Sequence, residues 1–198
     1  MKEYLATDTE SRGQVGIGTL IIFIALVLVA AVAAGVLIDT SGQLESRASD
    51  TGADAQAEVS NQVEVVSATG IDTSDNNKID EIELVIKKSA GSDPIDLSST
   101  TIQYNSGSAV KSLEQGSLAS DKFSVTSVVD DSGEISASNV LANSADRAKI
   151  TIDADAVEGS TDLSAGSDVD LKIVDQSGAS TVYGVNVPDV LTGKYVPV

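Results

Sequence analysis

Residues 15–38 contain no charged side chain, and this run constrains the fold of the chain more than any other feature. Fifteen of its 24 positions are Val, Ile, Leu or Phe. As a helix the run would reach about 36 Å, enough to cross the hydrocarbon core of a membrane, which is about 30 Å thick. Because the run has no polar stripe, such a helix must be enclosed by lipid or by other helices.

The polar stretch that precedes this run ends with Arg12 and Gly13, and Gln14 follows. In a secretory signal peptide the apolar segment comes before the cleavage site and is removed with it. A cut between Gly13 and Gln14 would instead leave the apolar segment at the new N-terminus. We therefore predict a leader peptide at residues 1–13. The alternative, from hydropathy alone, is a permanent single-span anchor.

Beyond residue 38 the pattern becomes amphipathic. Small and apolar side chains recur every three or four residues with charged side chains between them, which is typical of a helix with one face for a partner. These side chains are Leu37, Ser41, Leu44, Ala48, Gly52, Ala55, Val59, Val63 and Val66. No proline interrupts residues 14–67, and Gly70 is a reasonable C-terminal stop. The spacing predicts one helix over residues 14–69.

Residues 70–198 read as short strands separated by Ser, Asp, Asn and Gly clusters. We expect strands at residues 78–87, 100–104, 122–128, 148–153 and 168–173, and a last one at 181–187 before Pro188. Their apolar residues largely alternate with polar ones, as in antiparallel sheets with one solvated face. The alternation assigns to the core Ile82, Leu84, Ile86, Phe123, Val125, Ala148, Ile150, Ile152, Val169, Leu171 and Ile173. The predicted fold class is α+β: a long N-terminal hydrophobic helix followed by an antiparallel, Ig-like β-sandwich.

Composition excludes several classes of function. The chain has no cysteine and no histidine, so disulfides, thiol catalysis and histidine-based acid–base chemistry are excluded. A net charge of −18 argues against nucleic acid as a partner and suits a hypersaline medium, where salt screens the repulsion between copies. Residues 72–80 offer oxygen ligands without the spacing of a calcium loop. We expect no enzymatic activity, no metal and no cofactor.

Two segments together resemble one known family. Residues 12–25, Arg-Gly-Gln-Val-Gly-Ile-Gly-Thr-Leu-Ile-Ile-Phe-Ile-Ala, and their continuation to residue 42 resemble the N-terminus of archaeal flagellins, or archaellins, most closely the haloarchaeal ones. Residues 91–98, Gly-Ser-Asp-Pro-Ile-Asp-Leu-Ser, with Thr-Ile-Gln-Tyr at 101–104, are similar to a segment early in the β-domain of that family. The first match is long and specific, and the second is shorter.

The resemblance implies a secreted structural subunit. Archaellins are preproteins cut after a glycine by a prepilin-peptidase-like aspartic protease, which places processing at Arg12, Gly13 and Gln14. The N-terminal helix, residues 14–69, would leave the membrane to pack in the core of a rotating extracellular filament, with residues 70–198 outside. The residues expected to make this assembly helix pack are Gly16, Gly18, Leu20, Ile21, Phe23, Ile24, Leu26, Leu28, Val32 and Leu37.

The implied partners are other copies of the chain, paralogous archaellins, the peptidase, the membrane before assembly, and the export and motor platform of the archaellum. Two alternatives stay open from the sequence. One is an adhesive pilin of the same secretion class, which would share the retained helix. The other is a permanently anchored surface-binding module, which would keep its leader.

Overall fold

The computed structural model describes residues 4–159 and 162–198, and of residues 4–12 only the backbone. The chain divides into two compact units, one ending at Gly52 and the other beginning at Ala53. This division falls inside the N-terminal helix. The predicted boundary at residue 70 lies beyond this division, and the last two turns of the helix belong to the same unit as the sheet.

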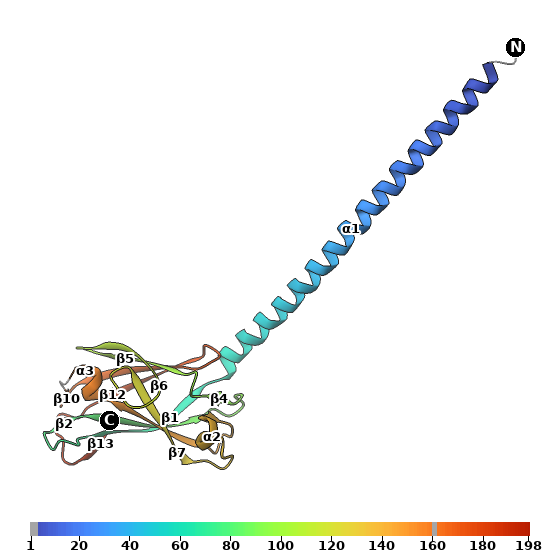
Figure 1. Ribbon diagram of the computed structural model, residues 1–198. Helices are drawn as coiled ribbons and strands as arrows, with labels where there is room; N and C mark the ends of the chain where they lie inside the picture. The colour runs from blue at the N-terminus through green and yellow to red at the C-terminus, as the bar shows by residue number, and fades with distance from the viewer. Residues whose placement is uncertain (1–3, 160–161) are drawn as a thin grey trace. The chain divides into compact units, whose positions relative to one another are not determined.

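Helix α1 runs without interruption over Tyr4–Ser60 (Figure 1). The predicted long apolar helix is therefore confirmed, although its end lies nine residues earlier than residue 69. Residues 1–3 of the predicted leader lie outside the described residues. The described part of the leader continues into the helix, so the helix has no break at Gly13.

Residues 63–69 belong to a strand and not to the helix. Strand β1 spans Val63–Ile71 and pairs antiparallel with β3, Glu81–Lys88, from Val63 opposite Lys88 to Ile71 opposite Glu81. The helical spacing of Val63 and Val66 was misleading, because β-branched residues also suit strands and the pairing partner lies about twenty residues away. A β-bulge between Val65 and Ser67 leaves Val66 exposed, whereas Val63 is buried.

One nine-stranded sheet forms the second unit, in the order β12-β11-β5-β6-β7-β9-β3-β1-β13. Its remaining strands are β5 (Thr101–Ser106), β6 (Val110–Gln115), β7 (Lys122–Val129), β9 (Arg147–Asp153), β11 (Asp168–Val174), β12 (Ser180–Asn186) and β13 (Tyr195–Pro197). Short pairs lie beside it: β2 (Lys78–Ile79) with β10 (Leu163–Ser164), and β4 (Ile95–Asp96) with β8 (Val140–Leu141). Neighbours in the sheet are antiparallel except β6 and β7, which pair in parallel over two residues.

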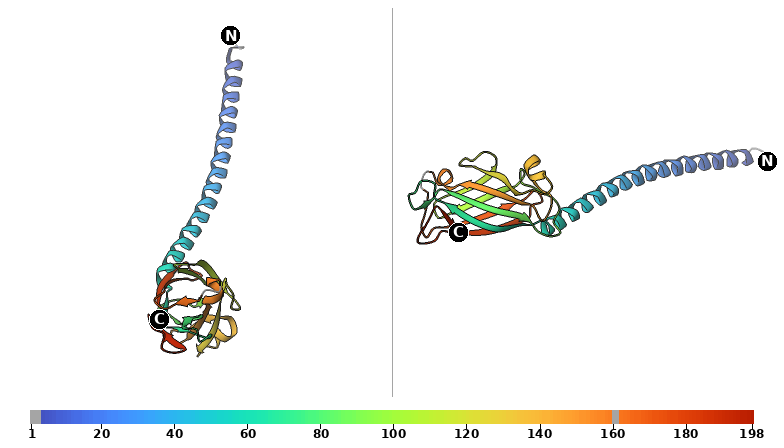
Figure 2. Two further views of the ribbon diagram at one scale, coloured as in Figure 1. Left: turned by 90° about the vertical axis from the view of Figure 1, so that its left-hand side faces the viewer. Right: turned by 90° about the horizontal axis from the view of Figure 1, so that it is seen from below.

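The sheet curls on itself, so that its two halves face each other across the core (Figure 2). Strand β12, at one end of the strand order, comes back beside β1 near the other end: the hydroxyl of Thr181 donates to the carbonyl of Val63 at 2.9 Å. The hydroxyl of Tyr183 donates to the carbonyl of Val198 at 3.3 Å. The expected antiparallel β-domain is confirmed, and its two layers come from one continuous sheet.

The core contains the side chains that the alternation had assigned to it. Ile82 lies opposite Ile152, Leu84 opposite Ile150, and Ile86 opposite Ala148 in the β3–β9 ladder, and all six are fully buried. Val125 alone among the predicted core residues is only partly buried. Cross-strand apolar pairs of this kind stabilise a sheet and fix its register, because a slip by one residue would turn them all to solvent.

Several elements were not predicted. Strands β6 and β13 and the five-residue helices α2 (Glu134–Ser138) and α3 (Ala154–Glu158) are absent from the sequence prediction, and β13 shows that the strand before Pro188 is not the last. The chain turns at residues 131–133 on its way into α2, where Gly133 has φ 76°. Five-residue helices and three-residue strands are too short to show a period in the sequence.

Ile150→Ala should destabilise the β-domain strongly. The side chain is fully buried, and its removal loses transfer free energy and leaves a cavity, so the free energy of unfolding should fall by about 2–5 kcal/mol. Denaturant unfolding of the full chain in detergent, followed by the β-sheet signal in circular dichroism, measures the change. Val182→Ala, on the exposed part of β12, serves as the matched control and should change stability by about 0.5 kcal/mol or less. Equal effects would contradict the assigned core.

Candidate assembly surface

The apolar part of α1 presents its side chains to the outside on every face. The consecutive residues Leu20, Ile21, Ile22 and Phe23 are 57%, 61%, 61% and 64% exposed. Successive residues of a helix are turned by about 100°, so four in a row sample the whole circumference. Within the described residues, no side chain of residues 15–38 is buried. This surface is too large and too apolar to remain in water alone.

Every predicted assembly residue lies on this surface. They are Gly16, Gly18, Leu20, Ile21, Phe23, Ile24, Leu26, Leu28, Val32 and Leu37, spread along one continuous helix and not gathered into a pocket. Seven more aliphatic side chains of the same run are at least half exposed and were left out of the prediction: Val15, Ile17, Ile22, Val27, Val29, Val36 and Ile38. The uncharged run itself is the signal that would have included them.

The glycines of α1 have no packing role inside the described chain. A Cβ atom added at Gly16, Gly18 or Gly35 would meet nothing within 4 Å apart from the helix's own nearby backbone. Glycine inside a helix costs about 1 kcal/mol relative to alanine. Small residues offset this cost where another helix packs against them, because they let the two backbones come close together. These positions therefore favour contacts with other molecules.

Thr19, the polar side chain of the apolar run, and Thr40, just beyond the run, are both satisfied within the helix. Thr19 donates its hydroxyl hydrogen bond to the carbonyls of Val15 and Gly16, at 3.1 and 2.9 Å, and Thr40 donates to Val36 at 2.7 Å. A hydroxyl that bonds its own backbone can enter an apolar environment without an unmatched donor. The helix can therefore be covered by lipid or by protein without further polar partners.

The predicted processing residues lie in the first part of α1. Gly13 and Gln14 are exposed, and the side chain of Arg12 falls outside the described residues. The backbone at all three positions is helical. The bond between Gly13 and Gln14 would have to leave the helical conformation to become extended for a protease, and glycine is the residue that makes this local unwinding least costly.

In the loop at residues 72–80, carboxylates organise the backbone. Asp80 accepts hydrogen bonds from the backbone amides of Thr73 and Ser74 at 2.7 and 2.8 Å, and from both their hydroxyls. Asp72 accepts from the amides of Asn76 and Asn77. In the described part of the chain, no three acidic side chains come together in a way that could hold a metal ion.

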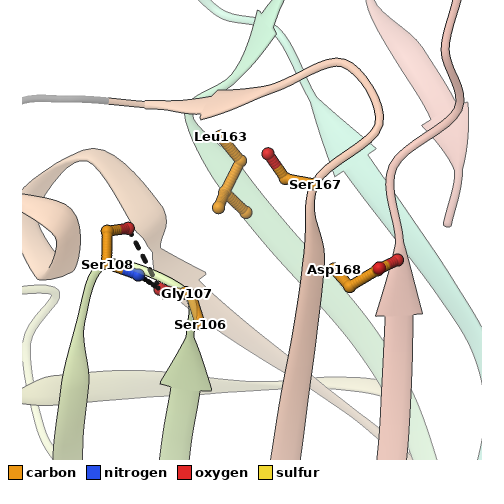
Figure 3. A pocket seen from close by; sticks show the side chains of 6 residues that line it. All are labelled: Ser106, Gly107, Ser108, Leu163, Ser167 and Asp168. Carbon is orange, nitrogen blue, oxygen red and sulfur yellow. Dashed lines mark hydrogen bonds between the residues drawn. The ribbon is translucent and has the colours of Figure 1, made fainter.

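Another carboxylate, that of Glu158, joins α3 to the β5–β6 turn. It accepts hydrogen bonds from the hydroxyls of Tyr104 at 2.8 Å, Ser106 at 2.5 Å and Ser108. Burial would raise the pKa of Glu158, but these bonds outweigh burial and lower it. Ser106 and Ser108 also line a surface pocket with Ser167 and other residues (Figure 3). The hydroxyls of Ser106 and Ser108 are bound to Glu158, so they connect α3 to the β5–β6 turn.

Comparison with known proteins identifies the family. The model of the archaeal-type flagellin family matches residues 13–185. Flagellin A2 of Halobacterium salinarum is 42% identical over 193 residues, which covers 95% of each chain. Flagellin A2 of Haloferax volcanii is 39% identical over 209 residues and covers 93% of each. The chain belongs to the archaeal-type flagellins.

Solved flagellin structures share the fold of this flagellin. A chain from the archaeal flagellum of Methanospirillum hungatei strain JF1 matches with a TM-score of 0.69 at 21% identity, covering 91% of this chain and 98% of that one. The crystal structure of flagellin FlaB1 from Methanocaldococcus jannaschii matches with a TM-score of 0.63 at 19% identity, covering 69% and 96%. The fold of this flagellin is thus shared with the first of these structures over nearly the whole chain and with the second over about two thirds of it.

Membership of this family fixes the kind of function. A flagellin is a structural subunit that self-assembles into the filament of an extracellular appendage for motility, and it is not an enzyme. The expected resemblance to haloarchaeal members is confirmed, and the acidic composition agrees with relatives from salt-loving organisms. The adhesive pilin and the anchored surface module are not favoured.

Asp80→Asn should weaken the flagellin at neutral pH and flatten its response to acid. Burial alone would raise the pKa of Asp80, but the hydrogen bonds from Thr73 and Ser74 outweigh burial and lower it below the ordinary value of 3.8. A lowered pKa means that the carboxylate stabilises the fold above about pH 4 and that this stability is lost as the pH falls through the folded pKa.

Chemical unfolding of both proteins at a series of pH values from about 7 to 2 measures this difference. At pH 7 we expect Asp80→Asn to lose about 1–3 kcal/mol, and the gap to the unmodified chain should close on acidification. Asp121→Asn, at an exposed carboxylate, serves as the control and should run parallel to the unmodified chain. A gap that stays constant down to pH 2 would contradict the role given to Asp80.

Proposed function

We propose that this flagellin reaches its filament by moving one helix between two apolar environments. The chain is inserted in the membrane through residues 15–38 as a precursor. A prepilin-peptidase-like protease removes residues 1–13, and the export platform of the archaellum transfers the mature subunit to the growing filament. There α1 packs against the α1 helices of other copies, and paralogous flagellins can share the filament.

The observation that carries this proposal is the exposed apolar surface of α1 around its whole circumference. Lipid shelters it before assembly and neighbouring helices shelter it afterwards, so the exchange changes little hydrophobic free energy. Close packing at Gly16, Gly18 and Gly35 then has to supply net stabilisation. The chain has no phosphate-binding loop, so a separate motor must provide the torque that the filament transmits.

Leu28→Lys should abolish filaments. The residue lies in the middle of the apolar run and is 62% exposed. Burying a lysine there costs about 2.5–3.5 kcal/mol in a membrane, and repetition at every subunit multiplies the cost in a filament. Electron microscopy of cells that express the variant as their only flagellin measures the outcome. Gln43→Lys adds the same charge beyond the apolar run and should still give filaments, whereas normal filaments from Leu28→Lys would contradict the assembly surface.

Gly13→Leu should block removal of the leader. Leucine favours the helical conformation by about 1 kcal/mol relative to glycine, so the bond to be cut should unwind less easily. Leucine also places a bulky side chain beside that bond. The intact mass of the membrane-bound chain should then include residues 1–13, while the unmodified chain should begin at Gln14.

Gly42→Leu makes the same change at another glycine of α1 that has open space around it, and this control should be cut normally. A mature chain that begins at a residue other than Gln14, or full cutting of Gly13→Leu, would contradict the proposed site. Neither result would contradict the assembly of the helix, which Leu28→Lys tests separately.

A further inference from the structure

The end of α1 is fastened to a loop that is distant in sequence. Asn61 and Ser92 are polar, yet they are only 4% and 6% exposed. Asn61 is the first residue after the helix, and Ser92 lies in the loop between β3 and β4. Both belong to the same compact unit as the sheet, which begins at Ala53. Buried polar side chains of this kind require hydrogen-bond partners.

Ser92 bonds both sides of the helix end. Its hydroxyl donates to the carbonyl of Ser60, the last helical residue, at 3.0 Å and accepts from the amide of Gln62 at 3.2 Å. The side-chain oxygen of Asn61 accepts from the amide of Asp93 at 2.8 Å. We call these five residues, Ser60, Asn61, Gln62, Ser92 and Asp93, the clasp.

The clasp replaces the usual end of a helix. The last carbonyls of a helix are commonly satisfied by a local glycine turn or by water. Here a hydroxyl from 32 residues further along the chain bonds the last of them. Residues 61 and 62 join α1 to β1, and the clasp adds to two backbone bonds there: the amide of Asn61 donates to the carbonyl of Ala57 at 2.7 Å, and the amide of Ser89 donates to the carbonyl of Gln62 at 2.9 Å.

The loop that carries Ser92 is itself held on both sides. Lys88, in β3, donates to the carbonyl of Ser92 at 2.7 Å. Gln176, between β11 and β12, donates to the carbonyl of Pro94 at 2.9 Å and accepts from the amide of Asp96 at 3.1 Å. The segment Gly-Ser-Asp-Pro at residues 91–94 therefore connects the helix end to two distant parts of the sheet.

We propose that the clasp is the torque joint of the subunit. It makes the end of α1 and the β-domain turn as one body, so that rotation of the helical core reaches the outer part of the filament without a swivel at residues 61 and 62. The proposal rests on the proposed function, because it takes α1 as the core of the filament. Asn61 and Ser92 are positioning residues and do not contribute to the apolar assembly surface.

Ser92→Ala in assembled filaments tests the proposal. Loss of both hydroxyl bonds should make the backbone amides of residues 57–62 exchange with solvent about tenfold faster, measured by hydrogen exchange and mass spectrometry. Amides of the β3–β9 ladder should be unchanged. In averaged electron-microscopy density the β-domain should become weaker than in unmodified filaments, while the helical core stays sharp. Asn61→Ala, which removes only the acceptor for Asp93, should give the same pattern to a smaller degree.

Ser99→Ala is the matched control, because it removes an exposed hydroxyl that bonds Asp96 and does not touch the clasp. It should leave exchange and density unchanged. Equal acceleration in the β3–β9 ladder and at residues 57–62 would show that Ser92 serves general stability, and unchanged exchange and density would show that it does not hold the joint. Both results overturn the proposal. Filaments whose core does not contain α1 would instead refute the proposed function.

Discussion

The structure depends on one imbalance: α1 exposes a full circumference of aliphatic side chains that nothing in the described chain covers. In the proposed pathway, lipid covers this surface first and other copies of the helix cover it afterwards, because both offer apolar contacts without charges. Thr19, the one polar side chain of residues 15–38, bonds its own backbone, so this run carries no unmatched polar side chain into an apolar environment. Polymerisation is thus a consequence of what the monomer leaves uncovered.

The β-domain follows the opposite rule and buries its own apolar side chains. Ile82, Leu84 and Ile86 meet their partners on β9 inside the domain. Most of the acidic side chains are exposed or half-buried, and the buried ones are Asp72, Asp80, Asp146 and Asp175. Because the domain buries its own apolar side chains, it can be exposed to a concentrated salt solution. Salt screens the electrostatic repulsion between the acidic surfaces of neighbouring subunits. The two units therefore have different roles: α1 provides the apolar contacts between subunits, and the β-domain provides a surface that faces the solvent. The clasp at Asn61 and Ser92 lies where the helix meets the domain.

Local sequence pattern predicted much of this arrangement. The uncharged run gave the helix and its exposed surface, and the period-two segments gave β3, β9, β11 and their core residues. The same reading failed at residues 63–69, because Val63 and Val66 satisfy a helical spacing and a strand composition equally well. It also missed β13 and the short helices α2 and α3, which contain too few residues for a period to be detected. The processing and assembly residues lie on one continuous segment, and their roles stay predictions.

By itself, the sequence determined that the chain has an apolar helix needing an external partner and an acidic β-domain without histidine or cysteine chemistry. These properties depend on composition and on neighbours three or four residues apart. Only the tertiary structure decided where the helix stops, how one sheet curls so that β12 returns to β1, and that Ser92 caps the end of α1. Those features depend on hydrogen bonds between residues separated by 32 to 118 positions, and no local period records such pairings.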